Sequence, residues 1–145
     1  MLLKSTAITT ALIGAIATSP ALAGDVEIVL DEVRGEAGTL YVSLQTEEQF
    51  LKEEGIVGEI IDDPQAGTVT VRFTDVPEGA YSFTAWHDID RDGQFTMGSR
   101  GPLDGWAMVG GAQLRGEPVF AEQSFTVGQG TARVRETMIY PAQER

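Results

Sequence analysis

Hydrophobic and polar residues alternate along most of the chain from Asp25 onward, a pattern typical of strands that place one face in a core and the other toward solvent. The clearest example follows Gly67, where Val69, Val71 and Phe73 alternate with polar residues and nearly every position is β-branched or aromatic. The same pattern, bounded by turn residues, predicts strands at residues 25–31, 39–45, 56–61, 68–74, 81–87, 119–127 and 131–140. We therefore expect an all-β protein, an antiparallel sandwich of about seven strands with one short helix.

Turn and capping residues refine this expectation. Residues 34–38 carry turn glycines, so the first two strands are expected to pair as an antiparallel hairpin. Thr46 and Gln49 have the spacing of a capping box, which predicts a short helix that ends by Gly55. Glu136 falls on the apolar face of the last strand. A β-bulge, an inward charge that protects a sheet edge and a buried ligand are all open interpretations of it.

The N-terminus has the features of a secretory signal peptide. Lys4 precedes an apolar run, and Pro20 and a small-x-small triplet ending at Ala23 follow it. The run is shorter than the roughly 20 residues that cross a bilayer, so we expect cleavage and no membrane span afterwards. The sequence thus predicts a signal peptide over residues 1–23, one sandwich domain over residues 24–145, and a periplasmic or secreted location.

Acidic residues dominate the charge of the chain, with 22 Asp and Glu against 10 Lys and Arg and a net charge of −12. This balance opposes binding to nucleic acid or to an anionic membrane surface. The chain contains no Cys, which excludes disulfides, thiol nucleophiles and thiolate metal sites. The remaining candidate chemistry is that of carboxylates.

Aspartates occupy every second position directly after the fifth predicted strand, at Asp88, Asp90 and Asp92, and Gly93 follows. Alternate side chains of a tightly turning segment converge, glycine permits the turn, and oxygen atoms are the ligands that Ca²⁺ prefers. In the same pattern Gln94 offers its backbone carbonyl. The spacing predicts a calcium-binding loop.

The loop departs from the helix-flanked calcium motif in two ways. Ser99 stands where that motif needs a bidentate Glu, and a strand rather than a helix precedes the loop. We expect a calcium loop at a strand end, completed by a carboxylate from elsewhere in the chain. Asp104 is preferred to Glu122 because it is nearer in sequence. An Asp-rich turn that binds no ion is the alternative.

Trp86, His87 and Trp106 flank this loop and are possible ligand contacts. Each also has a structural interpretation, since tryptophans in small domains often pack in the core and a lone histidine often satisfies a backbone carbonyl. By alternation His87 continues the inward face of its strand. Residues 97–118 are rich in Gly and Pro without a clean period, which indicates either a structured excursion or a mobile flap.

Several segments of the second half of the chain follow one another in a characteristic order. They are residues 73–81, Trp86-His87-Asp88 with Asp90, Asp92 and Gly93, residues 102–106, residues 118–120, and Phe125. In these segments the chain resembles the bacterial family catalogued as domain of unknown function 2141, small exported proteins with a predicted immunoglobulin-like or transthyretin-like sandwich. The resemblance implies this fold and export, but no activity.

These observations predict an exported, non-enzymatic protein in which bound Ca²⁺ has a structural role. A calcium-dependent module that binds a glycan or an envelope protein is the first alternative. A carboxylate-dependent hydrolase is the second and least favoured, because the chain has no Gly-x-Ser-x-Gly elbow and nothing identifies a catalytic pair of acids.

Overall fold

The computed structural model describes residues 22–35, 37–52 and 55–142 of the chain. Residues 1–21, which make up nearly all of the predicted signal peptide, lie outside the described residues. The structure has two single-turn 3₁₀ helices, η1 (Glu47–Gln49) and η2 (Gly111–Gln113). Its strands are β1 (Ala23–Val33), β2 (Thr39–Gln45), β3 (Val57–Asp62), β4 (Gly67–Pro77), β5 (Gly79–Asp88), β6 (Met97–Gly98), β7 (Gly101–Pro102), β8 (Gly105–Met108), β9 (Phe125–Val127) and β10 (Thr131–Thr137).

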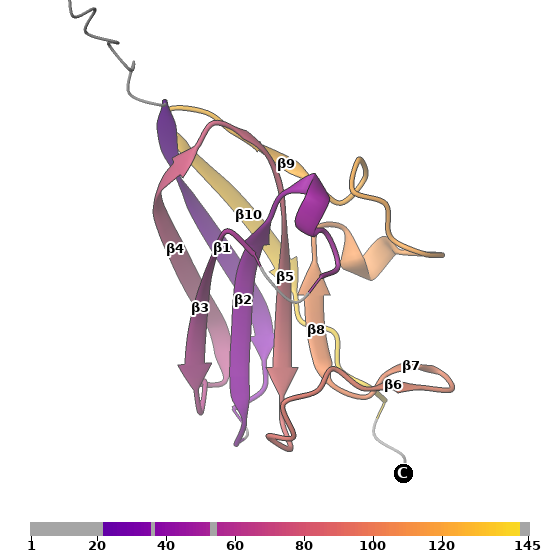
Figure 1. Cartoon of the computed structure of the whole chain (residues 1–145). Helices are drawn as coiled ribbons and strands as arrows, with labels where there is room; N and C mark the ends of the chain where they lie inside the picture. The colour runs from indigo at the N-terminus through magenta and orange to yellow at the C-terminus, as the bar shows by residue number, and fades with distance from the viewer. Residues whose placement is uncertain (1–21, 36, 53–54, 143–145) are drawn as a thin grey trace, which may run out of the picture.

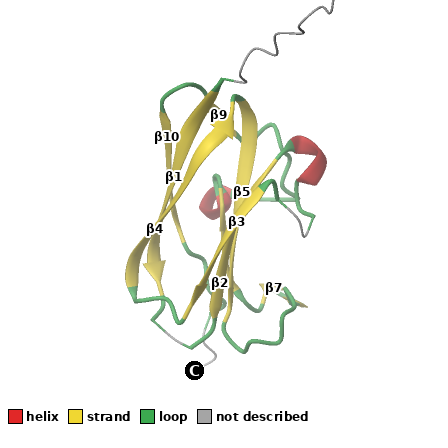
Figure 2. Ribbon diagram, turned by 60° about the vertical axis from the view of Figure 1, so that its left-hand side comes forward, coloured by secondary structure: helices red, strands yellow, loops and turns green. Residues whose placement is uncertain are grey.

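Most of these strands form two sheets that face each other across the core (Figures 1 and 2). The first sheet has the order β10-β1-β4, and the second has the order β3-β2-β5-β8, with β9 pairing with the start of β5. Strands β6 and β7 form a separate hairpin, which extends sideways near the end of β5 in Figure 1. The Gly-rich segment after residue 96 is thus a structured excursion that contributes three short strands.

The predicted hairpin between the first two strands is wrong. β1 pairs with β4 and β10, whereas β2 pairs with β3 and β5, so the connection after Val33 crosses from one sheet to the other. Both strands carry strongly apolar faces. Because the strands lie in different sheets, these faces pack against each other across the core, whereas in a hairpin they would lie side by side in one sheet. Gly38 allows the close passage, because a Cβ there would lie 2.6 Å from the carbonyl oxygen of Asp88.

The core lies between the two sheets and is filled by the inward face of each strand. Every second residue of β1 and β2 is fully or nearly fully buried, as the alternation of the sequence predicts. The most deeply buried apolar side chains are Val26, Ile28, Leu30, Leu40, Leu44 and Phe83.

One strand pair is parallel, contrary to the prediction of a purely antiparallel arrangement. β1 and β10 run in the same direction, with Asp25 opposite Thr131 and Asp31 opposite Thr137. The amide of Asp25 donates to the carbonyl of Gly130 at 3.1 Å, so β10 begins beside the start of β1. β9 ends near the start of β1. The strand that follows it, β10, therefore begins there and runs in the same direction as β1.

The short helix that was expected after Thr46 is reduced to the single 3₁₀ turn η1. The predicted capping box does form, and within it the amide of Thr46 donates to the Gln49 side chain at 3.2 Å. Leu51 then adopts a φ of 59°, which ends the helical conformation. Residues 53–54, the end of the expected helix, lie outside the described residues.

Candidate metal centre and adjoining groove

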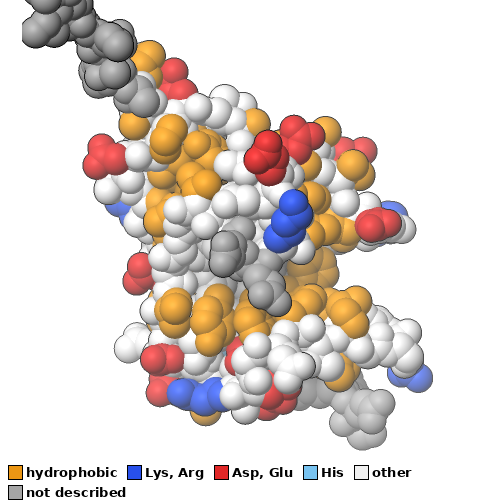
Figure 3. Space-filling view, viewed as in Figure 1, with side chains coloured by type: hydrophobic (Ala, Val, Ile, Leu, Met, Phe, Trp, Pro, Cys, Tyr) orange, Lys and Arg blue, Asp and Glu red, His pale blue; other side chains and the backbone are white. Residues whose placement is uncertain are grey.

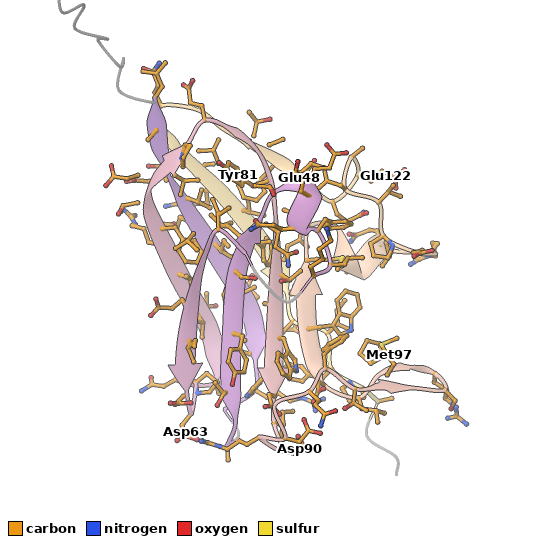
Figure 4. All side chains as sticks on the ribbon, viewed as in Figure 1. Glu48, Asp63, Tyr81, Asp90, Met97 and Glu122 are labelled. Atoms are coloured by element: carbon orange, nitrogen blue, oxygen red, sulfur yellow. The ribbon has the colours of Figure 1, made fainter. Side chains whose placement is uncertain are left out.

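The pairing of β5 with β8 brings Asp88 and Asp104 together. His87 lies opposite Gly105 in this antiparallel pair, so the residue after His87 and the residue before Gly105 meet at one end of the sheet. Asp90 comes from the loop that follows β5, where Figure 4 shows it. One carboxylate oxygen from each of the three aspartates lies within 4.8 Å of the others.

Asp88 is almost completely buried, with 1% of its surface exposed. Its two carboxylate oxygens accept hydrogen bonds from the loop that follows, from the amide of Asp92 at 3.2 Å and from the amide of Gly93 at 2.9 Å. Gly93 has a φ of 72°, a conformation that glycine adopts without strain. The loop therefore wraps around the Asp88 carboxylate.

Asp104 is also buried, at 6% exposure, and accepts a hydrogen bond from the amide of Thr96 at 3.0 Å. Burial raises the pKa of this carboxyl group above its ordinary value, and the negative charges of Asp90 and Asp88 raise it further. The Thr96 hydrogen bond and the nearby indole N–H of Trp86 act in the opposite direction. The indole lies close to the carboxylate but does not reach hydrogen-bond geometry. The net effect is a raised pKa, so the fold disfavours the charged form of this carboxyl group.

No basic side chain neutralises this cluster among the residues that the structure describes. The ion pairs of that part of the chain use Glu27, Asp31 and Asp63 as their acidic partners. Arg91 lies inside the aspartate loop, but its guanidinium pairs with Asp63. Asp88, Asp90 and Asp104 thus form an acidic centre whose hydrogen-bond donors are backbone amides.

Asp92, which was also predicted as a ligand, does not belong to the three-carboxylate cluster. The Asp92 carboxylate accepts the amide of Gln94 at 2.8 Å and so stabilises its own turn. The Gln94 carbonyl accepts the Thr96 hydroxyl at 3.5 Å. Glu122, the less favoured candidate, lies at the opposite end of the molecule from Asp90 in Figure 4. Asp104 is therefore the partner carboxylate that the fold supplies.

His87 faces the interior, as alternation predicts, and is fully buried. Its Nδ1 is 2.8 Å from the hydroxyl of Tyr140, which also accepts the amide of Arg34 at 3.0 Å. The Tyr140 ring fills the space beside Gly105, where a Cβ would lie 2.3 Å from a ring carbon. His87 thus lies behind the aspartate cluster, and its full burial favours the structural interpretation of this residue over contact with a ligand from solvent.

A row of aromatic residues crosses the outer face of the five-stranded sheet. Tyr41 of β2, Trp86 of β5 and Trp106 of β8 are aligned by strand register. The Tyr41 and Trp86 rings stack with their centroids 4.9 Å apart, and Phe95 from the aspartate loop meets Trp86 edge-on at 6.2 Å. In Figure 3 hydrophobic side chains form a band across the lower half of this face. Both predicted tryptophan contacts therefore lie on an outer surface.

A groove of about 830 Å³ runs beside this aromatic row. Its floor includes small polar side chains, and the hydroxyls of Ser43 and Thr84 lie 3.2 Å apart there. The segment after η1 contributes Leu51 and Lys52 to its lining, and the aspartate loop contributes Phe95. The groove and the aspartate cluster thus share one loop.

Sequence reasoning had not identified Tyr41, Ser43 or Thr84 as parts of a site. The available signal was Tyr41, an aromatic residue on the polar face of an alternating strand, at a position where solvent exposure is expected. Ser43 and Thr84 carried no such signal, because hydroxyl residues are ordinary on outward faces.

The described residues define an all-β protein with two facing sheets, an acidic centre of two buried aspartates and one exposed aspartate at one sheet end, and an aromatic groove on the adjoining outer face. The family model described as "Uncharacterized protein conserved in bacteria (DUF2141)" matches residues 28–135, well over half of the chain. The chain therefore belongs to this family, and the resemblance seen in the sequence is confirmed. Comparisons with curated proteins and with solved structures gave no significant match. Within the described ranges, no helix has the length and apolar character needed to cross a membrane.

Proposed function

We propose that this protein is an exported, non-enzymatic sandwich of the immunoglobulin-like or transthyretin-like type, in which Asp88, Asp90 and Asp104 bind a calcium ion with a structural role. The ion would hold the loop after β5 against the start of β8. The two facing sheets support the fold assignment. The signal-peptide pattern of residues 1–23 supports export.

The observation that carries the proposal is the convergence of three carboxylates, two of them buried, without a basic partner among the described residues. Buried charges in proteins are normally paired or coordinate a metal, because desolvation is otherwise too costly. A divalent cation would offset both the burial of Asp104 and its repulsion by the other two aspartates.

Calcium suits the donor set better than a transition metal. The cluster consists of oxygen atoms only, and the one histidine of the chain is bonded to Tyr140 on the inner side of the sheet. Ca²⁺ accepts six to eight oxygen ligands with flexible geometry, so carbonyl groups and water can complete its shell. Sites outside the cytoplasm typically bind calcium with dissociation constants of about 10⁻⁴–10⁻³ M.

The experiment is thermal unfolding of the mature protein in calcium, in magnesium and in chelator. At a calcium concentration tenfold above the dissociation constant, we expect stabilisation of about 1.4 kcal/mol, which corresponds to several degrees. Asp88→Asn should abolish the shift. Asp25→Asn is the matched control, since it removes one negative charge at the far end of β1 and should leave the shift intact.

Equal melting temperatures in calcium and chelator would refute the ion site. A shift with magnesium alone would refute calcium as the ion and favour a smaller octahedral site. Export is tested separately by the mass of the protein recovered from the periplasm or medium, which should correspond to a chain that begins at Gly24.

No contact in the site favours the hydrolase alternative. Asp88 and Asp104 are close enough to act as a pair, but they are 1% and 6% exposed, and the loop amides already occupy the oxygens of Asp88. A substrate would have no access to them. The binding-module alternative, in contrast, is favoured by the aromatic groove beside the loop.

A further inference from the structure

We propose that the groove on the outer face of the five-stranded sheet binds a neutral oligosaccharide. The aromatic row Tyr41, Trp86 and Trp106 would contact the apolar faces of the sugar rings, and the polar floor would hydrogen-bond the sugar hydroxyls. One wall of the groove is the loop that carries Phe95, and the inference rests on the proposed function only because the bound ion would hold this loop in place.

The aromatic side of the groove presents rings on three adjacent strands. Strand register aligns Tyr41, Trp86 and Trp106, so these residues form a continuous row rather than scattered exposed aromatics. All three are half-buried, and the stacking of Tyr41 on Trp86 restricts these two rings before a ligand arrives. Gly111 keeps room for the Trp106 ring, since a Cβ there would lie 3.0 Å from it. Rigid aromatic side chains supply contact area at low entropic cost.

The floor of the groove supplies polar groups that an apolar ligand could not use. The hydroxyls of Ser43 and Thr84 are 3.2 Å apart, and each can donate or accept a further hydrogen bond. Their neighbour on β3 is Gly58, which lies opposite Ser43 and leaves the floor without a bulky side chain. Gln94 also lines the groove. An aromatic wall beside a hydroxyl floor matches a sugar ring, which has one C–H face and a rim of hydroxyls.

Charge and shape narrow the class of ligand. The lining carries one basic residue, Lys52, and one acidic residue, Glu59, and the whole chain has a net charge of −12. The negative electrostatic field of the protein opposes the binding of anionic saccharides. The groove lies on an outer face of the sheet, so a wholly apolar ligand would stay partly hydrated, whereas a sugar can leave its outer hydroxyls in water. The volume of about 830 Å³ is within the range of small-ligand sites and leaves room for more than one ring.

The test measures binding of neutral oligosaccharides built of glucose, xylose or N-acetylglucosamine by calorimetry and by tryptophan fluorescence, with oligogalacturonate as the anionic probe. We expect at least one neutral oligosaccharide to bind and the anionic probe not to bind. Trp106→Ala should weaken binding about tenfold. Val119→Ala, which truncates an exposed hydrophobic side chain outside the groove lining, should have no effect.

A second pair of variants keeps the test valid if the tryptophan variant fails to fold. Ser43→Ala and Thr84→Val remove one floor hydroxyl each with little change in volume. Each should weaken binding several-fold in a protein that stays folded, with at most the small loss of stability that one hydrogen bond confers. Binding that is insensitive to all three substitutions would overturn the proposal. Binding of a protein or a detergent to this face, with no saccharide bound, would overturn it too.

Calcium and chelator arms separate this inference from the proposed function. A calcium-dependent melting shift without saccharide binding would refute the inference and leave the ion site standing. Saccharide binding without a calcium shift would support the inference and refute the ion site. If both are correct, chelator should weaken saccharide binding, because Phe95 belongs to the loop that the ion would hold.

Discussion

Asp104 is the residue at which burial and charge oppose each other most directly. Its carboxyl group is 6% exposed and lies beside Asp88 and Asp90. Its pKa is raised above the ordinary 3.8, first by burial and then by those charges. A raised pKa means that the folded protein binds the proton more tightly than the unfolded chain does. Metal-free stability therefore falls as the pH rises from 3.8 through the raised value, and the full cost is present above it.

The substitution Asp104→Asn removes this cost together with a candidate ligand. At neutral pH and in chelator, we expect the variant to melt at a higher temperature than the parent protein. In calcium the order should reverse, because the variant loses the gain of about 1.4 kcal/mol that the ion confers on the parent. Melting curves under both conditions measure this crossover. A variant that is less stable than the parent in chelator would show that the hydrogen bond that the Asp104 carboxylate accepts from the Thr96 amide outweighs the cost of its charge.

At the scale of the elements, β10 closes one edge of the three-stranded sheet and carries Glu136 on its inward side. Its register with β1 is continuous from Thr131 to Thr137, so the bulge interpretation is wrong. Instead, a carboxylate oxygen of Glu136 accepts the amide of Gly110 at 2.8 Å, just before η2. The inward charge thus joins the edge strand of one sheet to the turn that follows β8 in the other.

Replacing Glu136 tests this link between the two sheets. Glu136→Ala leaves the half-buried Gly110 amide without its acceptor and should destabilise the protein by about 1.5–3 kcal/mol, the usual worth of a hydrogen bond to a charged group. Glu136→Gln keeps an acceptor oxygen and should cost clearly less. Denaturant midpoints of the two variants, compared with that of the parent, test whether Glu136 acts as a hydrogen-bond acceptor. If its role were purely electrostatic, both substitutions would lower the stability by the same amount.

At the scale of the whole molecule, charges on the outer face of the three-stranded sheet link its strands. Glu27 on the central strand β1 pairs with Arg72 of β4 and Arg133 of β10, at 2.6 Å in each case. Asp31 pairs with Arg135 in the same way. The hydrogen bonds from Arg72 and then Arg133 are the main causes of a lowered Glu27 pKa. The sheet therefore holds Glu27 in its ionised form.

This lowered pKa gives a definite pH dependence. A carboxyl group with a depressed pKa contributes stability that is present above its ordinary value, 4.5 for Glu27, and is lost as the pH falls through the depressed value. We expect Glu27→Gln to melt below the parent protein at pH 7, and the difference to shrink as the pH falls below 4.5. Melting temperatures of both proteins across this range, at low and high salt, make the comparison. A difference that stays constant with pH would refute the electrostatic role of Glu27.

The alternation of the sequence determined which residues are buried and where most strands lie. Successive side chains of a strand point to opposite faces, and this holds whichever strands it pairs with. The alternation therefore predicted the inward faces of β1, β2, β4 and β5, including the burial of His87. The aspartate spacing likewise identified the loop. These are local properties, which depend on a few consecutive residues.

Strand partnership was decided only by the tertiary structure. Alternation does not say which sheet a strand joins, so it could not show that β1 and β2 separate or that β10 runs parallel to β1. For the same reason it could not align Tyr41, Trp86 and Trp106. The sequence named Asp104 only as the nearest further carboxylate, and it is the pairing of β5 with β8 that places Asp104 beside Asp88 and Asp90. Convergence of side chains far apart in sequence depends on the register between strands.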